Sequence, residues 1–491
     1  MRKIVFLLTI AFLFMGMLNA AIINIPDDYA TIQEGINSAE DGDTVLVADG
    51  VYTGMNNKNL TWDGDEKHII VKSQNGPENC IIDCEDDGRA FYFDSTNQDT
   101  TDVIDGFTMK NGFSNCGSGF YCRYSSPKIM NNIIKENLIS PLMGGGSGAG
   151  IYCYHSSSII RDNLITSNNI FCSGMPGFGE GAGLCILYGA PIIENNDIIN
   201  NEITASDLEC FASGAGLNVL NSSSQIKNNL IKGNSTIHQF EMSNSGGGMY
   251  CINYQDSSMI ILNNTIVSNH SAKGGGVLIN GYIIFDNNIC CNNSDDGIYW
   301  SGIGNVPKIE YNEVYDNTQN FIDCPPGIGD TTWGNNINGT SCDSCHNIIE
   351  DPLFVNPYDG NFHLTEGSPC IDAGDPNSPL DPDGTIADMG AYHYHQPASI
   401  DEPEYNSNII WNSPNPTKNA TTIQYFLKQN SHVKISIYNI KGQLISTFIN
   451  EYQIKGKHSV IYHTDTLKSG VYFYKVEAGE LIKVKKLVVI Q

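Results

Sequence analysis

The chain has 491 residues, 49 of them glycine, and a formal net charge of −28. Nucleic-acid binding depends on clustered Lys and Arg, so this negative charge argues against a nucleic-acid partner. The same charge would repel a polyanionic polysaccharide unless a divalent cation bridged the protein and the polysaccharide. Abundant glycine with few charged residues predicts a turn-dense β protein, long enough for two domains.

The first residues predict a secretory signal peptide, residues 1–20. Arg2 and Lys3 precede an apolar run over residues 4–14, which is followed by a small-residue boundary at Ala20–Ala21. A membrane-spanning anchor is disfavoured because the apolar run is too short to cross a bilayer. We therefore expect a soluble mature chain that begins near this boundary.

Seven similar segments repeat along the middle of the chain. They cover residues 125–137, 156–168, 189–201, 222–234, 257–269, 281–293 and 305–317. Their eighth positions are Asn132, Asn163, Asn196, Asn229, Asn264, Asn288 and Asn312, separated by steps of 24 to 35 residues. The shortest step fits one coil of three short strands, and coils of this kind stack ~4.8 Å apart. The repeats therefore predict a right-handed parallel β-helix.

The repeats also assign faces to these strands, because side chains alternate across a strand. The fifth position predicts an inward stack of Ile129, Ile160, Ile193, Ile226, Ile261, Phe285 and Ile309. The tenth position predicts a second stack of Ile134, Ile165, Ile198, Ile231, Ile266, Cys290 and Val314. The aligned asparagines are expected at sharp turns, in the left-handed conformation and hydrogen-bonded to a neighbouring backbone.

A second pattern, a glycine followed by an alternating strand, precedes these segments. It starts at Gly119, Gly150, Gly183, Gly216 and Gly248. The residues expected to point inward are Phe120, Ile151, Leu184, Leu217 and Met249, and two residues later Cys122, Cys153, Ile186, Val219 and Cys251. Cys122 and Cys153 are therefore expected to be buried as small hydrophobic side chains.

Fifteen cysteines in an exported chain suggest disulfide bonds, and the odd number leaves at least one unpaired or paired between chains. Cys80 with Cys84, or Cys116 with Cys122, could pair locally. Sequence spacing does not determine the connectivity.

Residues 22–394 resemble the pectate-lyase-like β-helix superfamily. The segment INIPDDYATIQEGINSAEDGDTVLVADGVYTG, residues 23–54, looks like the N-terminal cap of that family. By this resemblance, an amphipathic helix at Thr31–Ser38 covers the open end of the stack. Residues 351–376 and 381–394 are similar to the closing segment of many secreted bacterial β-helix repeat proteins. The resemblance is specific for the fold and weak for function.

The C-terminal segment has a different character, with predicted strands TTIQYFL, HVKISIYNI, GVYFYKV and LIKVKKLVVI. These strands predict a small β-sandwich. Residues 409–491 resemble the C-terminal sorting domain recognised by the type IX secretion system. The resemblance implies passage across the bacterial outer membrane, followed by release or attachment to its outer face. The Lys-rich ending fits this pattern better than the alternative, a carbohydrate-binding or adhesive sandwich.

The expected organisation is all-β, with a β-helix followed by a small sandwich. Its parts are a signal peptide at 1–20, a capped β-helix at 21–395, an acidic linker at 396–408 and the sorting domain at 409–491.

Four coils carry an insertion at the same place, directly after Asn137, Asn168, Asn201 and Asn234. Stacked insertions are expected to form a wall beside the glycine-led strands. The outward positions beside it give a candidate substrate-binding stripe of Tyr121, Tyr152, Tyr250 and Tyr299 in one column, with Arg123 and Tyr154 in the next. Exposed aromatic side chains hold sugar rings, so the stripe is a candidate glycan track. The alternative is that aromatic residues simply suit β-strands and are partly covered by loops.

Catalysis would require further groups on this face. A polysaccharide lyase needs a base beside the sugar C5 proton and a cation or Arg to neutralise the uronate. The candidate catalytic residues are Arg123, Tyr152 and His155. A glycosidase needs two carboxylates at a defined separation. The acidic residues of the insertions are Glu180, Asp207, Glu209 and Glu241, and acidic side chains in such loops are usually solvated.

Two segments have the spacing of metal or cofactor sites. CDSCH at residues 342–346 matches covalent haem attachment, but it is a single occurrence with no nearby helix or evident axial partner, which favours a local disulfide or free thiols over haem. Asp381, Asp383 and Asp388 surround a glycine turn as calcium ligands do. A complete twelve-residue calcium loop is missing, so a simple turn is the alternative.

The sequence therefore favours a secreted or surface-attached protein that binds a polysaccharide or cell-surface glycan without catalysis and is exported through its C-terminal domain by the secretion machinery. The alternative is an extracellular polysaccharide lyase or hydrolase that acts along the same wall-lined face.

Overall fold

The computed structural model describes residues 20–140, 146–174, 176–238, 244–302, 304–396, 411–427, 430–454, 456–479 and 481–490. Most of the predicted signal peptide, residues 1–19, and most of the predicted linker, within 397–410, lie outside these residues. The chain divides into two compact units between His395 and Gln396. Among the described residues, no helix has the length and apolar character needed to span a membrane.

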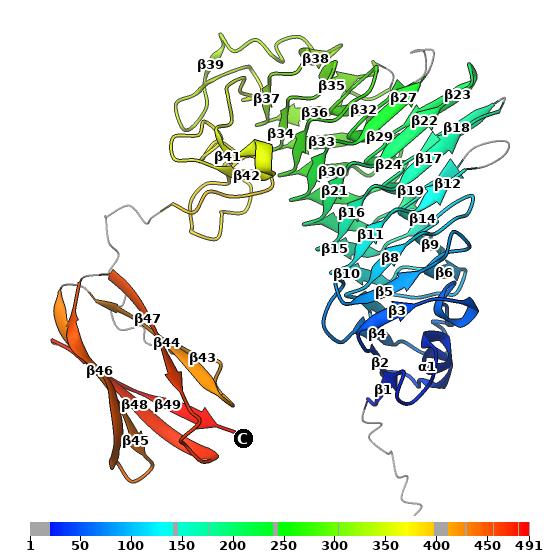
Figure 1. Cartoon of the computed structure of the whole chain (residues 1–491). Coiled ribbons are helices and arrows are strands. Elements are labelled where there is room, and N and C mark those ends of the chain that lie inside the picture. Colours follow the sequence, from blue (N-terminus) through cyan, green and yellow to red (C-terminus); the bar gives the residue numbers. More distant parts are fainter. Residues whose placement is uncertain are drawn as a thin grey trace, which may run out of the picture. The chain divides into compact units, whose positions relative to one another are not determined.

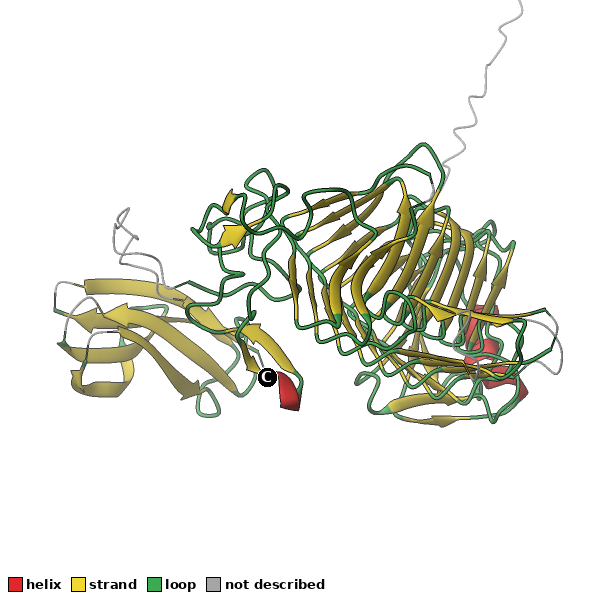
Figure 2. Cartoon of the chain, turned by 90° about the horizontal axis from the view of Figure 1, so that it is seen from above, coloured by secondary structure: helices red, strands yellow, loops and turns green. Residues whose placement is uncertain are grey.

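The first unit is a parallel β-helix with three long sheets in its described part, as the stacked strands in Figures 1 and 2 show. Sheet A contains β1 (Ile22–Ile25), β2 (Thr44–Val47), β4 (Ile70–Ser73), β7 (Val103–Asp105), β10 (Lys128–Met130), β15 (Ile159–Arg161), β20 (Ile192–Glu194), β25 (Gln225–Lys227), β30 (Met259–Leu262), β33 (Ile283–Asp286) and β36 (Lys308–Glu310). Sheet B contains β3 (Gly50–Tyr52), β5 (Cys80–Asp83), β8 (Thr108–Lys110), β11 (Ile133–Lys135), β16 (Leu164–Thr166), β21 (Asp197–Ile199), β26 (Leu230–Lys232), β31 (Thr265–Val267), β34 (Ile289–Cys291) and β37 (Glu313–Tyr315). Sheet C contains β6 (Phe91–Asp94), β9 (Phe120–Arg123), β14 (Ile151–Ser156), β19 (Leu184–Gly189), β24 (Leu217–Leu220), β29 (Met249–Asn253), β32 (Val277–Gly281), β35 (Asp296–Trp300) and β38 (Gln319–Ile322).

The interior of this unit confirms the predicted columns. Every residue predicted to point inward, from both the repeats and the glycine-led strands, is at most 1% exposed. The columns stack in register, as with Ile129 opposite Ile160 in sheet A and Ile134 opposite Ile165 in sheet B. Burial of these aliphatic stacks is the main stabilising term of the solenoid.

The aligned asparagines form a hydrogen-bonded ladder, but the prediction of their backbone conformation was wrong. The left-handed residue is the one before each of them, for example Asn131 (φ 55°) and Asn195 (φ 56°). This turn directs the following side chain into the corner, where Asn132 donates from Nδ2 to the Ile104 carbonyl at 3.1 Å. The aligned asparagines are therefore buried side-chain links rather than the strained turn residues themselves.

A second ladder runs along the corner that follows sheet B. Its members are Asn137, Asn168, Asn201, Asn234, Asn269, Asn293 and Asn317. This second ladder was not predicted from the sequence, although asparagine ends every one of the seven repeats.

The glycine that leads β9, β14, β19, β24 and β29 of sheet C is required by the approach of the next coil. A Cβ atom on Gly183 would lie 2.5 Å from the Gly216 carbonyl oxygen. No side chain fits between coils at that distance, which explains the repeated glycine.

The N-terminal cap contains α1 (Ile32–Ser38), which confirms the expected helix. Thr31 caps it: the Glu34 N–H donates to Thr31 Oγ1, and the Glu34 carboxylate accepts the Thr31 N–H. This reciprocal pair satisfies two backbone groups at the helix start. Ile32 and Ile36 are fully buried and close the end of the stack. A short 3₁₀ turn, η1 (Met55–Asn57), follows the next strands.

The closing segment packs on the outer face of sheet B. Phe362, Leu364 and Met389 are buried there with Leu230 and Val267 of the sheet. Its regular elements are β39 (Gly334–Asn335), β40 (Ser341–Cys342), β41 (Phe354–Asn356), η2 (Pro357–Asp359) and β42 (Asn361–Leu364).

The second unit contains two antiparallel sheets. One is β43 (Trp411–Ser413), β44 (Ala420–Leu427) and β47 (Gly456–His463); the other is β46 (Leu444–Gln453), β45 (Ser431–Asn439), β48 (Gly470–Ala478) and β49 (Leu481–Val489). Ile423, Ile435 and Tyr474 lie in their common core. The four predicted strands of this unit are all present.

All fifteen cysteines lie within the described residues, and none of them is bonded to another in the structure. Neither Cys80 with Cys84 nor Cys116 with Cys122 is bonded. Cys122 and Cys153 are fully buried in the inward stack, as predicted.

Candidate functional site

The four insertions form the predicted wall. Figure 1 shows their strands side by side along one edge of the β-helix. Sheet D contains β12 (Leu138–Ile139), β17 (Asn169–Cys172), β22 (Glu202–Ala205) and β27 (Ser235–His238). Sheet E contains β13 (Gly146–Ser147), β18 (Gly177–Glu180), β23 (Cys210–Ser213) and β28 (Asn244–Ser245). Residues such as Ile170, Ile203 and Ala212 form a separate apolar core in the wall. The wall is therefore an ordered second layer rather than a set of loops.

Sheet E meets the outer face of sheet C along a corner, and the residues that line this corner, among them Ser147, Glu180, Ser213 and Asn218, are called the groove. Asn218, an outward residue of β24, donates from Nδ2 to Ser213 Oγ at 2.7 Å. Ser147 Oγ donates to Glu180 Oε2 at 3.0 Å. Burial raises the pKa of Glu180 above its ordinary value. One side of the groove is thus polar and carries a carboxyl group that ionises less readily than usual.

The predicted tyrosine stripe lies in the groove, but it is not a continuous aromatic track. The outward column of sheet C consists of Tyr92, Tyr121, Tyr152, Cys185, Asn218, Tyr250, Leu278 and Tyr299. Cys185 and Asn218 are 0% exposed because the base of the wall covers them. The predicted members Tyr121, Tyr152, Tyr250 and Tyr299 are half-buried.

The first three rings of this column stack on one another. Ring centroids are 5.1 Å apart between Tyr92 and Tyr121, and 5.3 Å apart between Tyr121 and Tyr152. The Arg89 guanidinium lies 5.1 Å from both the Tyr92 and the Tyr121 ring centroids. Because neighbouring rings cover each other's faces, the column offers ring edges and hydroxyl groups rather than flat faces. The sequence analysis missed Tyr92 and Arg89.

A second aromatic cluster lies at the C-terminal ends of β9, β14 and β19. His155 stacks between Tyr124, at 5.1 Å, and Tyr188, at 4.8 Å. These three residues all have left-handed backbones, with φ of 49–63°, which aligns their rings in successive coils. Tyr154 meets the His155 ring edge-on at 4.6 Å. Arg123 pairs with Asp94 at 3.1 Å, so its charge is already neutralised.

The wall adds an exposed aromatic pair that the sequence analysis missed. Phe178 and Phe211 are 44% and 47% exposed, and their rings stack at 5.6 Å. Phe178 lies two residues before Glu180 on β18, so both point away from the wall core and toward the groove. Sequence spacing could have identified this pair, because each phenylalanine lies five residues before a strand-leading glycine, Gly183 or Gly216.

The three candidate catalytic residues fall into two groups of contacts. Tyr152 lies in the stacked column, whereas His155 and Arg123 both contact Tyr124, with ring centroids 5.1 Å apart for His155 and the guanidinium 5.2 Å from the ring for Arg123. Arg123 is also paired with Asp94. Burial raises the pKa of Tyr152 well above its ordinary value, so its hydroxyl is a hydrogen-bond donor at neutral pH rather than a base.

The acidic residues of the insertions are dispersed. Glu180 lies in the groove, whereas Asp207 Oδ2 accepts the Gly174 N–H at 2.6 Å within the wall. Glu209 pairs through its backbone carbonyl with the Gly177 N–H. Glu241 lies outside the described residues.

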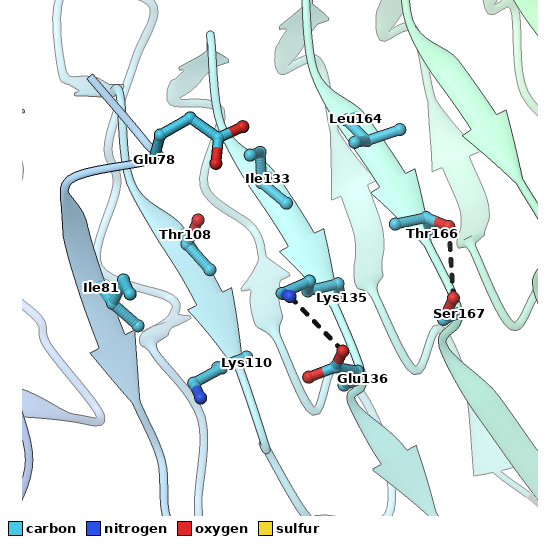
Figure 3. Close-up of a pocket in the computed structure, with 10 residues that line it drawn as sticks. All are labelled: Glu78, Ile81, Thr108, Lys110, Ile133, Lys135, Glu136, Leu164, Thr166 and Ser167. Atoms are coloured by element: carbon cyan, nitrogen blue, oxygen red, sulfur yellow. Dashed lines mark hydrogen bonds and ion pairs between the residues drawn. The ribbon is translucent and has the colours of Figure 1, made fainter. Parts of the chain in front are cut away.

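A shallow depression of about 430 Å³ occupies the outer face of sheet B (Figure 3). Ile133 and Leu164 form its apolar part. Lys110 and Lys135 border it, and they pair with Asp83 at 3.2 Å and Glu136 at 3.4 Å. None of the predicted site residues lines this depression.

The predicted calcium ligands act as hydrogen-bond acceptors for the closing segment. Asp388 Oδ1 and Oδ2 accept the backbone N–H groups of Asp372 at 2.7 Å and Tyr394 at 2.6 Å. Asp381 Oδ2 accepts the Asp388 N–H, and Asp383 accepts the Thr385 hydroxyl. Burial raises the pKa of Asp388 to about 7. Calcium binding at these residues stays a prediction.

Another group of potential ligands lies near the N-terminal end. Within the described part of the chain, His68, Asp99 and Asp102 are the group whose ligand atoms lie within 4.8 Å of one another. Asp102 Oδ1 accepts the Trp62 Nε1–H at 2.8 Å, and Oδ2 lies 2.8 Å from His68 Nδ1. The buried carboxylate is therefore already satisfied by protein groups.

The haem-like segment is folded into the closing turns. Cys342 is 2% exposed, and its Sγ lies 4.0 Å from His346 Nδ1. The His346 ring stacks on Tyr311 at 4.7 Å. Cys342 and Cys345 are not bonded to each other in the structure.

Comparison with known proteins gives a similar solved structure and a match to a family model. No curated protein sequence matches the chain. The crystal structure of pectate lyase Pel9A is similar at 13% identity, covers 77% of this chain and 98% of its own, and has a TM-score of 0.43.

The C-terminal unit has a specific relative. Residues 413–490 match the family model described as a secretion system C-terminal sorting domain. The match confirms the resemblance stated for residues 409–491 and indicates export in a bacterium, followed by secretion or attachment at the cell surface. The protein is therefore a parallel β-helix that carries a C-terminal domain similar to those recognised by type IX secretion.

Proposed function

We propose that the β-helix binds polysaccharide along the groove, without catalysis, at the cell surface or in the medium. The exposed Phe178–Phe211 pair beside the tyrosine column carries this proposal. Aromatic rings hold the apolar faces of sugars, while phenol hydroxyls and serine side chains bond the sugar hydroxyls. The exposed edges and outer faces of the stacked phenylalanines supply apolar surface for the first kind of contact, and the hydroxyl groups of Tyr121 and Tyr152 supply the second.

The spacing of the groove supports an extended chain as ligand. Tyrosine side chains recur in three successive coils, where the Tyr92, Tyr121 and Tyr152 rings are 5.1 and 5.3 Å apart. That repeat is comparable to the length of one pyranose ring along an extended polysaccharide. A glycan lying parallel to the helix axis would therefore meet similar groups at successive sugars.

Charge favours a neutral glycan. The chain carries a formal charge of −28, and the groove contains the carboxyl group of Glu180. Arg123, which would otherwise neutralise a uronate, pairs with Asp94. A uronate polymer would face repulsion that a neutral polymer avoids.

An enzyme acting along the same groove is the alternative. A lyase would need Tyr152 or His155 as a base, with Arg123 free to hold the sugar carboxylate. The raised pKa of Tyr152 and the pairing of Arg123 support binding over elimination.

The test is incubation of the mature protein with immobilised neutral and uronate polysaccharides, each with and without calcium. We expect retention on a neutral polysaccharide, with no release of reducing ends and no absorbance from unsaturated uronates. Turnover that is lost in Tyr152→Phe or His155→Ala would establish the enzyme instead. The absence of both retention and turnover would reject the groove as a glycan site.

A further inference from the structure

Two cysteines face each other inside the wall, from opposite layers and from successive coils. Cys172 is the last residue of β17 in sheet D, and Cys210 is the first residue of β23 in sheet E. They are 1% and 0% exposed and belong to the apolar core between the two sheets.

Gly177 shows how close the two sulfur atoms come. This residue pairs with Cys210 in sheet E. A Cβ atom on Gly177 would lie 2.7 Å from Cys210 Sγ and 2.9 Å from Cys172 Sγ. Both sulfur atoms therefore border the one small space that the missing side chain leaves open. Burial, and then the hydrogen bond with Cys210, raise the pKa of Cys172 to about 12.

We propose that Cys172 and Cys210 form a disulfide bond in the exported protein. Export, indicated by the C-terminal sorting domain, brings the chain to a compartment where disulfides form and persist. The bond links sheet D of one coil to sheet E of the next, so it braces the wall across its layers and along its length.

Cys122 and Cys153 provide a contrast within the same chain. Their thiols are in contact, but they are direct neighbours in register on parallel strands β9 and β14, so their side chains leave the backbone in the same direction. Cys122 Sγ also donates to the Ser125 carbonyl at 2.8 Å. This pair stays reduced.

The oxidation requires a disulfide-bearing oxidant, such as a thiol oxidoreductase of the export compartment. One cysteine thiolate attacks the oxidant's disulfide and gives a mixed disulfide, and the second cysteine displaces the oxidant as a dithiol. The two cysteines lose two protons and two electrons, and the oxidant takes up both. Because burial suppresses thiolate formation in the packed wall, the bond forms before the wall closes.

The disulfide would lie on the face of sheet E opposite to the groove and would restrain the sheet that carries the groove's phenylalanines. Phe178 and Phe211 lie on β18 and β23, next to Gly177 and Cys210 respectively, with their rings on the opposite face. Fixing sheet E to sheet D limits the separation of these rings from the wall core. The disulfide thereby preserves the groove outside the cell.

The test is peptide mapping of the full-length exported protein, isolated without reductant and alkylated under denaturing conditions. Trypsin is unsuitable because no Lys or Arg lies between Arg161 and Lys227. A protease that cleaves after glutamate separates Cys172, Cys185 and Cys210 at Glu180, Glu194 and Glu209. We expect a cross-linked peptide pair containing Cys172 and Cys210, which reductant abolishes.

The variants distinguish this bond from other oxidation. Cys172→Ala and Cys210→Ala should each lose the cross-link, whereas Cys122→Ala should retain it. Recovery of wild-type protein with Cys172 and Cys210 both alkylated would overturn the proposal, whether or not the alanine variants fold. A cross-link from either residue to Cys185 would overturn it equally.

Discussion

Asn163 donates two hydrogen bonds to the side-chain oxygen of Asn196, from its backbone N–H at 3.1 Å and from Nδ2 at 2.9 Å. Asn196 in turn donates from Nδ2 to Asn229 Oδ1 at 3.0 Å and to the Ile160 carbonyl at 2.9 Å. Each side chain of the ladder thus satisfies backbone and side-chain groups of its neighbours. Because these groups are buried, an interruption leaves several of them without partners.

Replacement of one ladder residue should therefore cost much more than replacement of its neighbour in the turn. For Asn196→Ala we expect a loss of about 3 kcal/mol in the free energy of unfolding, since several buried hydrogen bonds disappear together. For Asn195→Gly we expect a change within about 0.5 kcal/mol, because this exposed residue has a φ of 56° that glycine also adopts. Denaturant unfolding of both variants measures the difference. Equal losses would contradict the role assigned to the ladder.

A methyl group at a strand-leading glycine should be poorly tolerated. In Gly183→Ala the new Cβ would lie 2.5 Å from the Gly216 carbonyl oxygen and 3.1 Å from Asn201 Nδ2. The coils would have to separate, and we expect a loss of about 2 kcal/mol. Gly334→Ala is the control, because its Cβ would meet nothing within 4 Å. If thermal unfolding of the two variants shifts equally, close coil packing does not explain the repeated glycine.

The sequence predicted the solenoid well because its signals are local and repeated. Alternation fixes which of Ile129 and Lys128 points inward, and the 24-residue step between Asn264 and Asn288 fixes the size of a coil. The turn conformation was placed one residue late, since Asn131 and Asn132 are identical in type and only geometry tells them apart.

The groove was harder to predict. The tyrosine column depends on register across insertions of different length, and Cys185 and Asn218 interrupt it beneath the base of the wall. Phe178 and Phe211 lie inside those insertions, outside the repeats that defined the coils. Their importance comes from the distant contact between sheets E and C, which no local pattern reports.

The pair of His68 and Asp102 should make the free energy of unfolding depend on pH. The hydrogen bond to Asp102 raises the pKa of His68 above its ordinary value of about 6.5. The folded state therefore holds the proton more tightly than the unfolded state. The stabilisation that His68 contributes to the folded state is complete below the pKa of His68 in the unfolded chain. It is lost as the pH rises through the pKa of His68 in the folded protein.

We therefore expect the difference in unfolding free energy between wild type and His68→Gln to be larger at about pH 5 than at about pH 9. His270→Gln is the control, because His270 Nδ1 bonds the neutral hydroxyl of Ser294. Denaturant unfolding across this range measures both differences. A difference for His68→Gln that does not vary with pH would exclude a charged pair.

Loss of a wall phenylalanine should weaken glycan binding only where the phenylalanine faces the groove. Phe171, Phe178 and Phe211 are similarly exposed, at 47%, 44% and 47%. Phe178 and Phe211 point from sheet E toward the groove, whereas Phe171 points outward from sheet D on the other side of the wall core. Removal of a ring that covers a sugar costs on the order of 1 kcal/mol, so Phe178→Ala and Phe211→Ala should each raise the Kd of a retained neutral polysaccharide roughly fivefold. Phe171→Ala has the same loss of exposed aromatic surface and should leave the Kd unchanged. Affinity electrophoresis of the three variants compares them directly. If all three substitutions weaken binding equally, non-specific hydrophobic contact with the wall explains the retention. If none of them weakens binding, the glycan lies elsewhere on the β-helix.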